Sequence, residues 1–337
     1  MTLGRQAGED DATVVLRVPP APARATPAGS EPPPRQAPDR HRFALRSVLV
    51  ATRPRQWTKN LLVYAAPAAA GVVDRATPLL RATAAAVLFV AVSAAMYLVN
   101  DVLDQEADRL HPVKRTRPVA SGAISSRAAL TVAGALLVTA LALGGLLSVR
   151  LLAVLAIYAA ITVAYSLWLK EVAVVELACV ASGFILRAIA GGVAVAVPLS
   201  PWFLLVTSFG ALFVVAGKRS SEQLVMGDER AVHRATLGDY PAVYLRAVRA
   251  LAATVTVAAY CLWAFDHSVH ASGPRVDSQH LIWFELSIVP FVLAVLVVEL
   301  AFEQGRGGEP EELALRHRPL QVLGLCWLAL LLVGIYT

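Results

Sequence analysis

Long apolar segments with almost no charged residues follow one another from residue 60 to the C-terminus, and they limit the folds open to this chain. A helix needs about 20 residues to cross the ~30 Å hydrocarbon core of a bilayer, and most of these segments reach that length. Charged residues gather between the segments, as expected where a charge at the bilayer centre is costly. We therefore predict an all-α polytopic membrane protein, a bundle of about nine transmembrane helices. The expected helices cover residues 60–73, 79–100, 127–148, 150–169, 172–197, 201–217, 244–265, 281–300 and 318–336.

The length of the chain would allow two soluble domains, but the composition argues against them. Hydrophobic residues make up 57% and charged residues 16% of the 337 residues, against about 45–50% and about 25% in soluble proteins. A soluble protein this apolar would expose large hydrophobic patches. The three cysteines lie far apart in apolar segments, which excludes a disulfide scaffold and gives no metal-binding spacing.

The N-terminal region has a different composition. Eight of the twenty prolines fall within residues 1–40, among Arg and Ala residues that show no periodicity. Such segments cannot bury enough apolar surface to fold. We predict a disordered Pro/Arg-rich cytosolic tail over residues 1–45, followed by one transmembrane domain over residues 46–337.

The basic residues predict the orientation, because cytosolic loops carry an excess of Lys and Arg. With a cytosolic N-terminus, 25 of the 30 Lys and Arg residues lie on the cytosolic side, four lie on the opposite side, and Arg187 lies within a helix. This distribution predicts a multi-pass protein of the cell membrane with its N-terminus in the cytosol and its C-terminus outside.

Four side chains with oxygen donors lie where the second apolar segment reaches the cytosol. They are Asn100, Asp101, Asp104 and Asp108, and at 100° per residue they fall within an arc of roughly 100°. Mg²⁺ takes oxygen ligands and shares its remaining positions with phosphate oxygens and water. We predict a Mg²⁺ site here. The alternative is a solvated acidic helix end, which the basic run that follows makes less attractive.

That basic run contains Lys114, Arg115 and Arg117 between Pro112 and Pro118. The two prolines predict a mobile loop in place of a continued helix. Guanidinium groups bind phosphate through paired hydrogen bonds, so carboxylates beside this loop predict a diphosphate site. The alternative is that the basic residues only determine the topology.

Together these motifs resemble the first aspartate-rich motif of the UbiA superfamily of intramembrane prenyltransferases, whose nine transmembrane helices agree with the count above. The resemblance runs from about residue 50 to the C-terminus. One departure concerns the second aspartate-rich motif of the superfamily, which should follow the sixth span. Here the corresponding loop is expected to begin with Gly217, Lys218 and Arg219 and to include Glu222; it has no DxxxD motif, and a basic pair takes the place of the acidic one. Further matching motifs are Arg53–Asn60, Tyr97–Asp101, Leu186–Gly192 and Trp263–Phe265.

The resemblance implies an enzyme, and within the superfamily the chain is most similar to members that act as phosphoribosyltransferases. It implies transfer of a 5-phosphoribosyl group from phosphoribosyl diphosphate (PRPP) to decaprenyl (polyprenyl) phosphate, with release of diphosphate, in the synthesis of cell-wall arabinan precursors. Asp101, Asp104 and Asp108 would be catalytic and, with Asn100, would hold Mg²⁺. No general base is needed, because a phosphate monoester is already ionised at pH 7.

Two other functions stay open from the sequence. One is a UbiA-type prenyltransferase that joins a prenyl diphosphate to an aromatic or other lipid acceptor, which the basic Lys218 and Arg219 argue against. The other is a transporter, which would need charges along a path to both faces, whereas the acidic and basic motifs gather on one side.

Further polar residues are expected to bind the substrates. Lys218 and Arg219 would hold the 5-phosphate of the donor, and Lys59 either the acceptor phosphate or lipid head groups. Glu176 and Arg187 lie three turns apart on one helix face, but about 16 Å separates them in depth, so direct pairing would need a third partner. The substrate-binding set is Lys59, Lys114, Arg115, Arg117, Tyr165, Lys170, Glu176, Arg187, Lys218, Arg219 and Glu222. The expected partners are PRPP, polyprenyl phosphate and membrane lipids; no nucleic acid is expected, and a homo-oligomer is left open.

Overall fold

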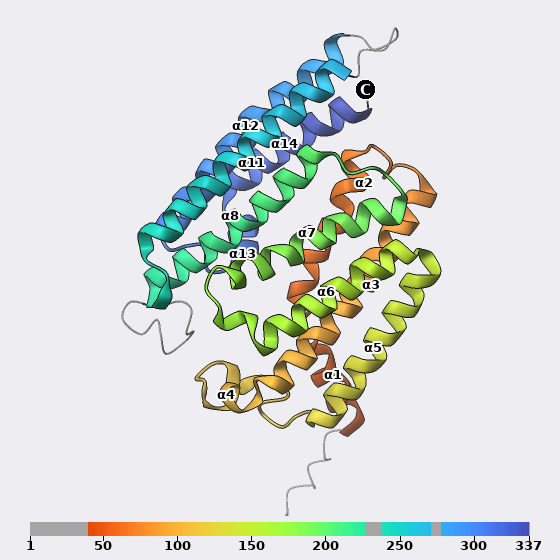
Figure 1. Cartoon of the computed structure of the whole chain (residues 1–337), viewed down its shortest axis with the longest axis vertical. Coiled ribbons are helices and arrows are strands. Elements are labelled where there is room, and N and C mark those ends of the chain that lie inside the picture. Colours follow the sequence, from red (N-terminus) through yellow and green to blue (C-terminus); the bar gives the residue numbers. More distant parts are fainter. Residues whose placement is uncertain (1–39, 227–237, 271–277, 337) are drawn as a thin grey trace, which may run out of the picture. The chain divides into compact units, whose positions relative to one another are not determined.

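The computed structural model describes residues 40–226, 238–270 and 278–336, and all regular elements in these ranges are helices (Figure 1). The predicted tail falls mainly on residues 1–39, which lie outside the described residues, and the first helix already begins at Arg40. The α-helices are α1 (Arg40–Ala51), α2 (Ala65–Ala69), α3 (Ala76–Leu103), α4 (Gln105–Leu110), α5 (Ser126–Leu147), α6 (Val149–Leu167), α7 (Val175–Val195), α8 (Pro201–Met226), α11 (Ala242–His270), α12 (Ser278–Glu303), α13 (Pro310–Arg316) and α14 (Arg318–Tyr336). The 3₁₀ helices are η1 (Pro54–Tyr64), η2 (Lys114–Thr116) and η3 (Leu169–Glu171).

Eight of the helices in the described ranges are long and apolar enough to cross a membrane, which confirms the all-α membrane class. They are α3, α5, α6, α7, α8, α11, α12 and α14. Serine side chains begin two of them, since Ser125 accepts a hydrogen bond from the amide of Ala128 and Ser148 from that of Arg150, satisfying amides that a helix start leaves unpaired.

The first predicted helix, over residues 60–73, is not one continuous α-helix. The structure instead has the eleven-residue helix η1 followed by the five-residue helix α2. A 3₁₀ helix rises about 2.0 Å per residue, so the two together cover about 30 Å, close to the thickness of a bilayer core.

Contacts along α3 show the course of this segment. The Arg53 guanidinium, just before η1, contacts Asp101 near the end of α3. At the other end of η1, the Tyr64 hydroxyl donates to Oγ1 of Thr83 at 3.0 Å. The segment therefore runs antiparallel to α3 along most of its length, as a crossing segment would.

Glycine on α7 allows η1 to pack closely. A Cβ atom built on Gly191 would overlap the carbonyl oxygen of Val63 and lie 3.1 Å from Cδ of Pro67. The absence of a side chain at Gly191 is thus what allows the η1 backbone to lie directly on α7.

Replacing Gly191 with Ala should destabilise the protein, because the new methyl group meets backbone atoms that cannot rotate away. Overpacking costs about 1–3 kcal/mol, which corresponds to a drop of roughly 3–10 °C in the unfolding midpoint. The matched control is Gly134→Ala in α5, where a Cβ would meet no atom within 4 Å and would favour the helix. Thermal unfolding in detergent measures both variants, and equal midpoints would show that this contact does not hold η1.

Helix α7 lies between two groups of helices (Figure 1). It packs against η1, α3 and α6 on one side and against α8 on the other, while α11 packs on α8 and α12 pairs with α14. The largest hydrophobic core cluster lies in the first group and includes Phe89, Leu98 and Leu155. Because α7 contacts both groups, residues at its ends can join the two.

Helix α8 extends nine residues beyond its predicted end at residue 217. The residues predicted to start a loop, Gly217, Lys218 and Arg219, are therefore helical. Gly217 packs against Phe302 of α12, whose ring a Cβ at this position would overlap. This packing, together with an ion pair of Arg219 described below, explains why a charged segment continues the helix.

Candidate functional site

The predicted acidic residues lie at a break between two helices. Helix α3 ends at Leu103, α4 begins at Gln105, and Asp104 joins them with φ −92° and ψ 8°. Two backbone hydrogen bonds still follow helical spacing, from the amide of Asp104 to the carbonyl of Asn100 at 2.9 Å and from that of Asp108 to the carbonyl of Asp104 at 2.8 Å. The break therefore leaves the helical spacing of the acidic residues intact.

Two of the carboxylates are buried and share one arginine. Asp101 is 1% exposed and Asp108 is 3% exposed. Nη1 of Arg117 lies 2.6 Å from Oδ2 of Asp108 and 3.4 Å from Oδ1 of Asp101, and Arg53 also contacts Asp101. Since an unpaired buried charge is strongly destabilising, these two arginines are what allow both carboxylates to be buried.

Asp104 is more accessible and is bound by residues of neighbouring segments. Nζ of Lys170, in η3, lies 2.7 Å from its Oδ1, and Nδ2 of Asn100 donates to its Oδ2 at 3.0 Å. Oδ1 of Asn100 in turn accepts a hydrogen bond of 3.0 Å from Ser166 of α6. The ends of α3 and α6 are thereby tied together around Asp104.

The basic run after α4 forms a loop with one short 3₁₀ helix, η2, which confirms that the helix does not continue. The amides of Val113 and Lys114 both donate to Nδ1 of His111 at 3.2 Å. From α4, Gln105 and Arg109 donate to backbone carbonyls of residues 119 and 120. The loop is therefore held against α4, with Arg117 turned to the carboxylates and the Arg115 side chain exposed.

A second cluster joins α7 to α8. Glu176, in the first turn of α7, is fully buried and accepts hydrogen bonds from Nε and Nη2 of Arg219, both at 2.9 Å. Nη1 of Arg219 donates to Glu222 at 2.9 Å, and Nζ of Lys218 lies 4.0 Å from Glu222. An electrostatic interaction also links Arg219 with Tyr165 of α6.

This arrangement changes the expected role of Arg219, which was predicted to hold the 5-phosphate of the donor. Three nitrogen atoms of Arg219 contact carboxylates, which leaves it few donors for a substrate phosphate. Lys218 is half-exposed and better placed for that contact. The structure thus brings the predicted residues Tyr165, Glu176, Lys218, Arg219 and Glu222 together in one cluster.

Arg187 lies apart from both clusters, deep among the helices, and does not pair with Glu176. Its guanidinium donates to Asn60 at 2.8 Å, to the carbonyl of Gly183 at 2.6 Å, and to Ser93 and Tyr158 at 3.1 Å each. It also lies over the ring of Tyr158. These contacts join η1, α3, α6 and α7, so Arg187 holds these segments together, and its predicted part in substrate binding stays a prediction.

Lys59 lies on η1 next to Asn60, and its ammonium group is 5.7 Å from the centre of the Phe184 ring of α7. This cation–π contact places Lys59 at the boundary between η1 and α7, which is consistent with either of its predicted roles.

Two residues that were not predicted to belong to the site, Arg53 and Ser166, also contact it. Arg53 has positive φ and ψ of 54° and 67° between α1 and η1, and its guanidinium lies 4.8 Å from the centre of the Tyr97 ring. Its position before Pro54 signalled a break in the chain but did not indicate its partner. Ser166 gave no signal, because its contact with Asn100 joins residues 66 positions apart.

The ionic contacts determine what the acidic cluster can do. Within the described ranges, no three His, Cys, Asp or Glu side chains converge so that they could hold a metal ion. The carboxylates instead face Arg53, Arg117 and Lys170. Their donor chemistry still fits Mg²⁺, since Asp101, Asp104, Asp108 and Asn100 supply only hard oxygen ligands besides the amide nitrogen.

Comparisons with known proteins give the family. Residues 61–315 match the UbiA prenyltransferase family. The decaprenyl-phosphate phosphoribosyltransferase of Mycobacterium tuberculosis is 46% identical over 84% of this chain and 92% of its own length. That of Mycolicibacterium smegmatis is 43% identical over 86% and 92%. The fold is similar to that of a UbiA homologue from Archaeoglobus fulgidus solved with DMAPP and Mg²⁺, with a TM-score of 0.63, 18% identity, and coverage of 86% of this chain and 99% of that one. This chain belongs to the UbiA prenyltransferase family.

Proposed function

We propose that this protein transfers a 5-phosphoribosyl group from PRPP to decaprenyl phosphate and releases diphosphate, as a step in the synthesis of cell-wall arabinan precursors. The observation that carries the proposal is the pairing of Asp101, Asp104 and Asp108 with Arg53, Arg117 and Lys170 at one end of a bundle of apolar helices. The donor and acceptor are suggested by relatives named decaprenyl-phosphate phosphoribosyltransferase.

The same end of the bundle suits binding of a diphosphate with a divalent cation. We assign Mg²⁺ to Asn100, Asp101, Asp104 and Asp108, where it would supply positive charge to stabilise the departing diphosphate. Arg53, Arg117 and Lys170 neutralise the carboxylates in this structure. Phosphate oxygens, like carboxylate oxygens, accept charge-assisted hydrogen bonds from Arg and Lys, so the same residues can hold the donor.

The reaction then needs little proton transfer. An oxygen atom of the ionised acceptor phosphate attacks the anomeric carbon of the ribose, while the bond from that carbon to the diphosphate oxygen breaks. Negative charge moves to the diphosphate, where the preorganised side chains of Arg53, Arg117 and Lys170 stabilise it. The apolar helices allow the polyprenyl tail to stay in the bilayer while its phosphate reaches the polar end.

We assign the second cluster to the 5-phosphate of the donor. Lys218 contacts the phosphate in this proposal, and Arg219 is a positioning residue that holds α8 against Glu176. Together with the excess of basic residues on this side, the clusters support a cytosolic active site in the cell membrane.

The proposed reaction can be tested with purified protein in lipid nanodiscs. Incubation with decaprenyl phosphate, Mg²⁺ and PRPP labelled in the ribose should give a labelled lipid and an equal amount of diphosphate. EDTA should stop the reaction and added Mg²⁺ should restore it. Turnover of a prenyl diphosphate with an aromatic acceptor, without labelled lipid from PRPP, would contradict the proposal and favour the prenyltransferase alternative.

Replacing Lys218 with Ala should raise the KM for PRPP about tenfold, because one charge-assisted contact with the 5-phosphate is lost. Lys218→Arg keeps the charge and should stay within about threefold of the wild type. Arg306→Ala, an exposed basic residue after α12, serves as the control for a general loss of positive charge. An equal change in KM for Lys218→Ala and Arg306→Ala would remove Lys218 from the donor site.

A further inference from the structure

The connection between η3 and α7 contains a strained turn. Val174 has φ 67° and ψ −46°, and the amide of Val175 donates to the carbonyl of Ala173 at 2.8 Å. These values describe a γ-turn with positive φ at its centre, which is rare and strained. Valine is poorly suited to this position, because a β-branched residue with positive φ is a conformational outlier.

The strained turn lies between the two clusters of the site. Lys170, four residues before it, contacts Asp104, and Glu176, two residues after it, holds Arg219. The backbone angles at Val174 therefore set how these two contacts are placed relative to each other. Strained conformations persist only where the surrounding structure holds them, and they are common at functional sites.

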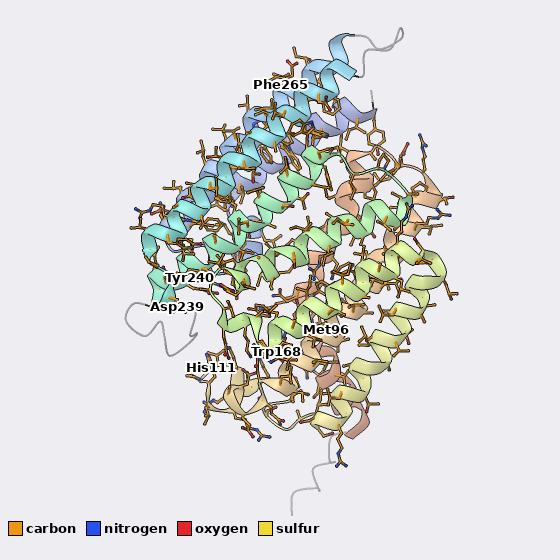
Figure 2. The ribbon with its side chains drawn as sticks, in the orientation of Figure 1. Met96, His111, Trp168, Asp239, Tyr240 and Phe265 are labelled. Carbon is orange, nitrogen blue, oxygen red and sulfur yellow. The ribbon has the colours of Figure 1, made fainter. Side chains whose placement is uncertain are left out.

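The side chain that holds this turn is Tyr240, just before α11. Its hydroxyl oxygen accepts a hydrogen bond from the amide of Val174 at 2.6 Å, and its own carbonyl accepts one of 2.7 Å from Gln223 of α8. The buried Tyr240 ring packs in one hydrophobic cluster with residues of three helices, Leu177 and Ala181 of α7, Ala211 and Val215 of α8, and Leu245 of α11. In Figure 2, Tyr240 lies at the same end of the helices as Trp168 and His111 and opposite Phe265.

The environment keeps the Tyr240 hydroxyl neutral. Burial and the charge of Glu176 both raise the pKa of this phenol, and they outweigh the hydrogen bond from Val174, which lowers it. At neutral pH the oxygen is therefore a hydroxyl oxygen that accepts the hydrogen bond from the Val174 amide.

We propose that Tyr240 is a positioning residue for the transfer reaction, whose hydroxyl holds the γ-turn at Val174 and so sets Lys170 against Asp104 and Glu176 against Arg219. The kinetic part of this inference rests on the proposed function. The structural part does not, because the hydrogen bond to Val174 can be tested without any substrate.

Tyr240→Phe removes only the hydroxyl, and the full chain in nanodiscs is used for both measurements. Hydrogen–deuterium exchange of peptides covering residues 168–178 should become about tenfold faster, because the Val174 amide loses its partner. The KM for PRPP should rise about tenfold, while the KM for decaprenyl phosphate stays within twofold. A purely structural defect would lower the amount of active enzyme and leave both KM values unchanged.

Two further variants control the test. Tyr244→Phe makes the same chemical change in a partly exposed ring that stacks on Tyr240, and it should leave exchange and KM as in the wild type. Val174→Gly removes the conformational strain, and when added to Tyr240→Phe it should lower the KM for PRPP at least threefold.

The outcomes separate this inference from the proposed function. Unchanged exchange in Tyr240→Phe would overturn the inference. Faster exchange with an unchanged KM for PRPP would also overturn it. So would a double variant, Tyr240→Phe with Val174→Gly, whose KM for PRPP is no lower than that of Tyr240→Phe alone. If the wild type forms no labelled lipid, the proposed function fails and the positioning role in this reaction fails with it. The exchange data would still decide whether Tyr240 holds the turn.

Discussion

Asp104→Asn should lower kcat for phosphoribosyl transfer about a thousandfold or more. The change removes a negative charge from the predicted Mg²⁺ ligands and replaces the carboxylate oxygen that contacts Lys170 with a neutral group. Loss of metal stabilisation of the leaving group is worth several kcal/mol, and each 1.36 kcal/mol is a factor of ten in rate. Asparagine has nearly the same shape, so the helix break at residue 104 should be kept.

The matched control is Glu106→Gln, which makes the same chemical change two residues further along. Glu106 is exposed and lies in the first turn of α4, so its variant should keep kcat within about twofold. Rates at saturating PRPP are measured over a Mg²⁺ titration, with size-exclusion chromatography to show that each variant is folded. Near-normal turnover by Asp104→Asn would remove Asp104 from the metal site, and an equal loss in Glu106→Gln would show only a general need for negative charge.

Glu176→Gln should produce the largest loss of stability among single changes in the second cluster. It leaves the buried guanidinium of Arg219 with Glu222 as its remaining carboxylate partner in the cluster. Removal of one partner of a buried ion pair costs about 3–5 kcal/mol, which corresponds to roughly 6–20 °C in the unfolding midpoint. Thermal unfolding in detergent measures this change.

Replacing both partners separates the ion pair from the packing. Since apolar residues can substitute for a whole buried pair at little cost, Glu176→Leu combined with Arg219→Met should recover at least half of the lost midpoint while leaving the enzyme inactive. The control is Glu312→Gln, which breaks the exposed pair with Arg316 and should change stability by less than about 1 kcal/mol. A midpoint for Glu176→Gln no lower than that of Glu312→Gln would show that the buried pair does not hold α7 to α8.

The sequence predicted most of the helices, because the bilayer imposes long uncharged segments that are visible without any tertiary information. Helix α14 has the predicted bounds, residues 318–336. The segment over 60–73 was predicted as apolar but not as a 3₁₀ helix, and its close packing on Gly191 joins residues far apart in the sequence. The extension of α8 was missed because its charges are compensated by Glu176 on another helix.

The candidate site was predictable where its residues are close in sequence. Asn100, Asp101, Asp104 and Asp108 keep helical spacing, so their common location could be worked out from residue numbers alone. Their cationic partners come from distant segments, with Arg53 48 and Lys170 66 positions away from the carboxylates they contact. The γ-turn at Val174 opposes the local preference of its own residue, so only the tertiary contact with Tyr240 explains it.

A cryo-EM map of the protein with Mg²⁺ and diphosphate would test most directly whether the end of α3 holds the leaving group. We predict density for the metal ion beside Asn100, Asp104 and Asp108, with the Arg117 guanidinium in hydrogen-bond contact with diphosphate. Diphosphate bound elsewhere, with Arg117 still on Asp101 and Asp108 and no metal density between the carboxylates, would contradict the proposed mechanism.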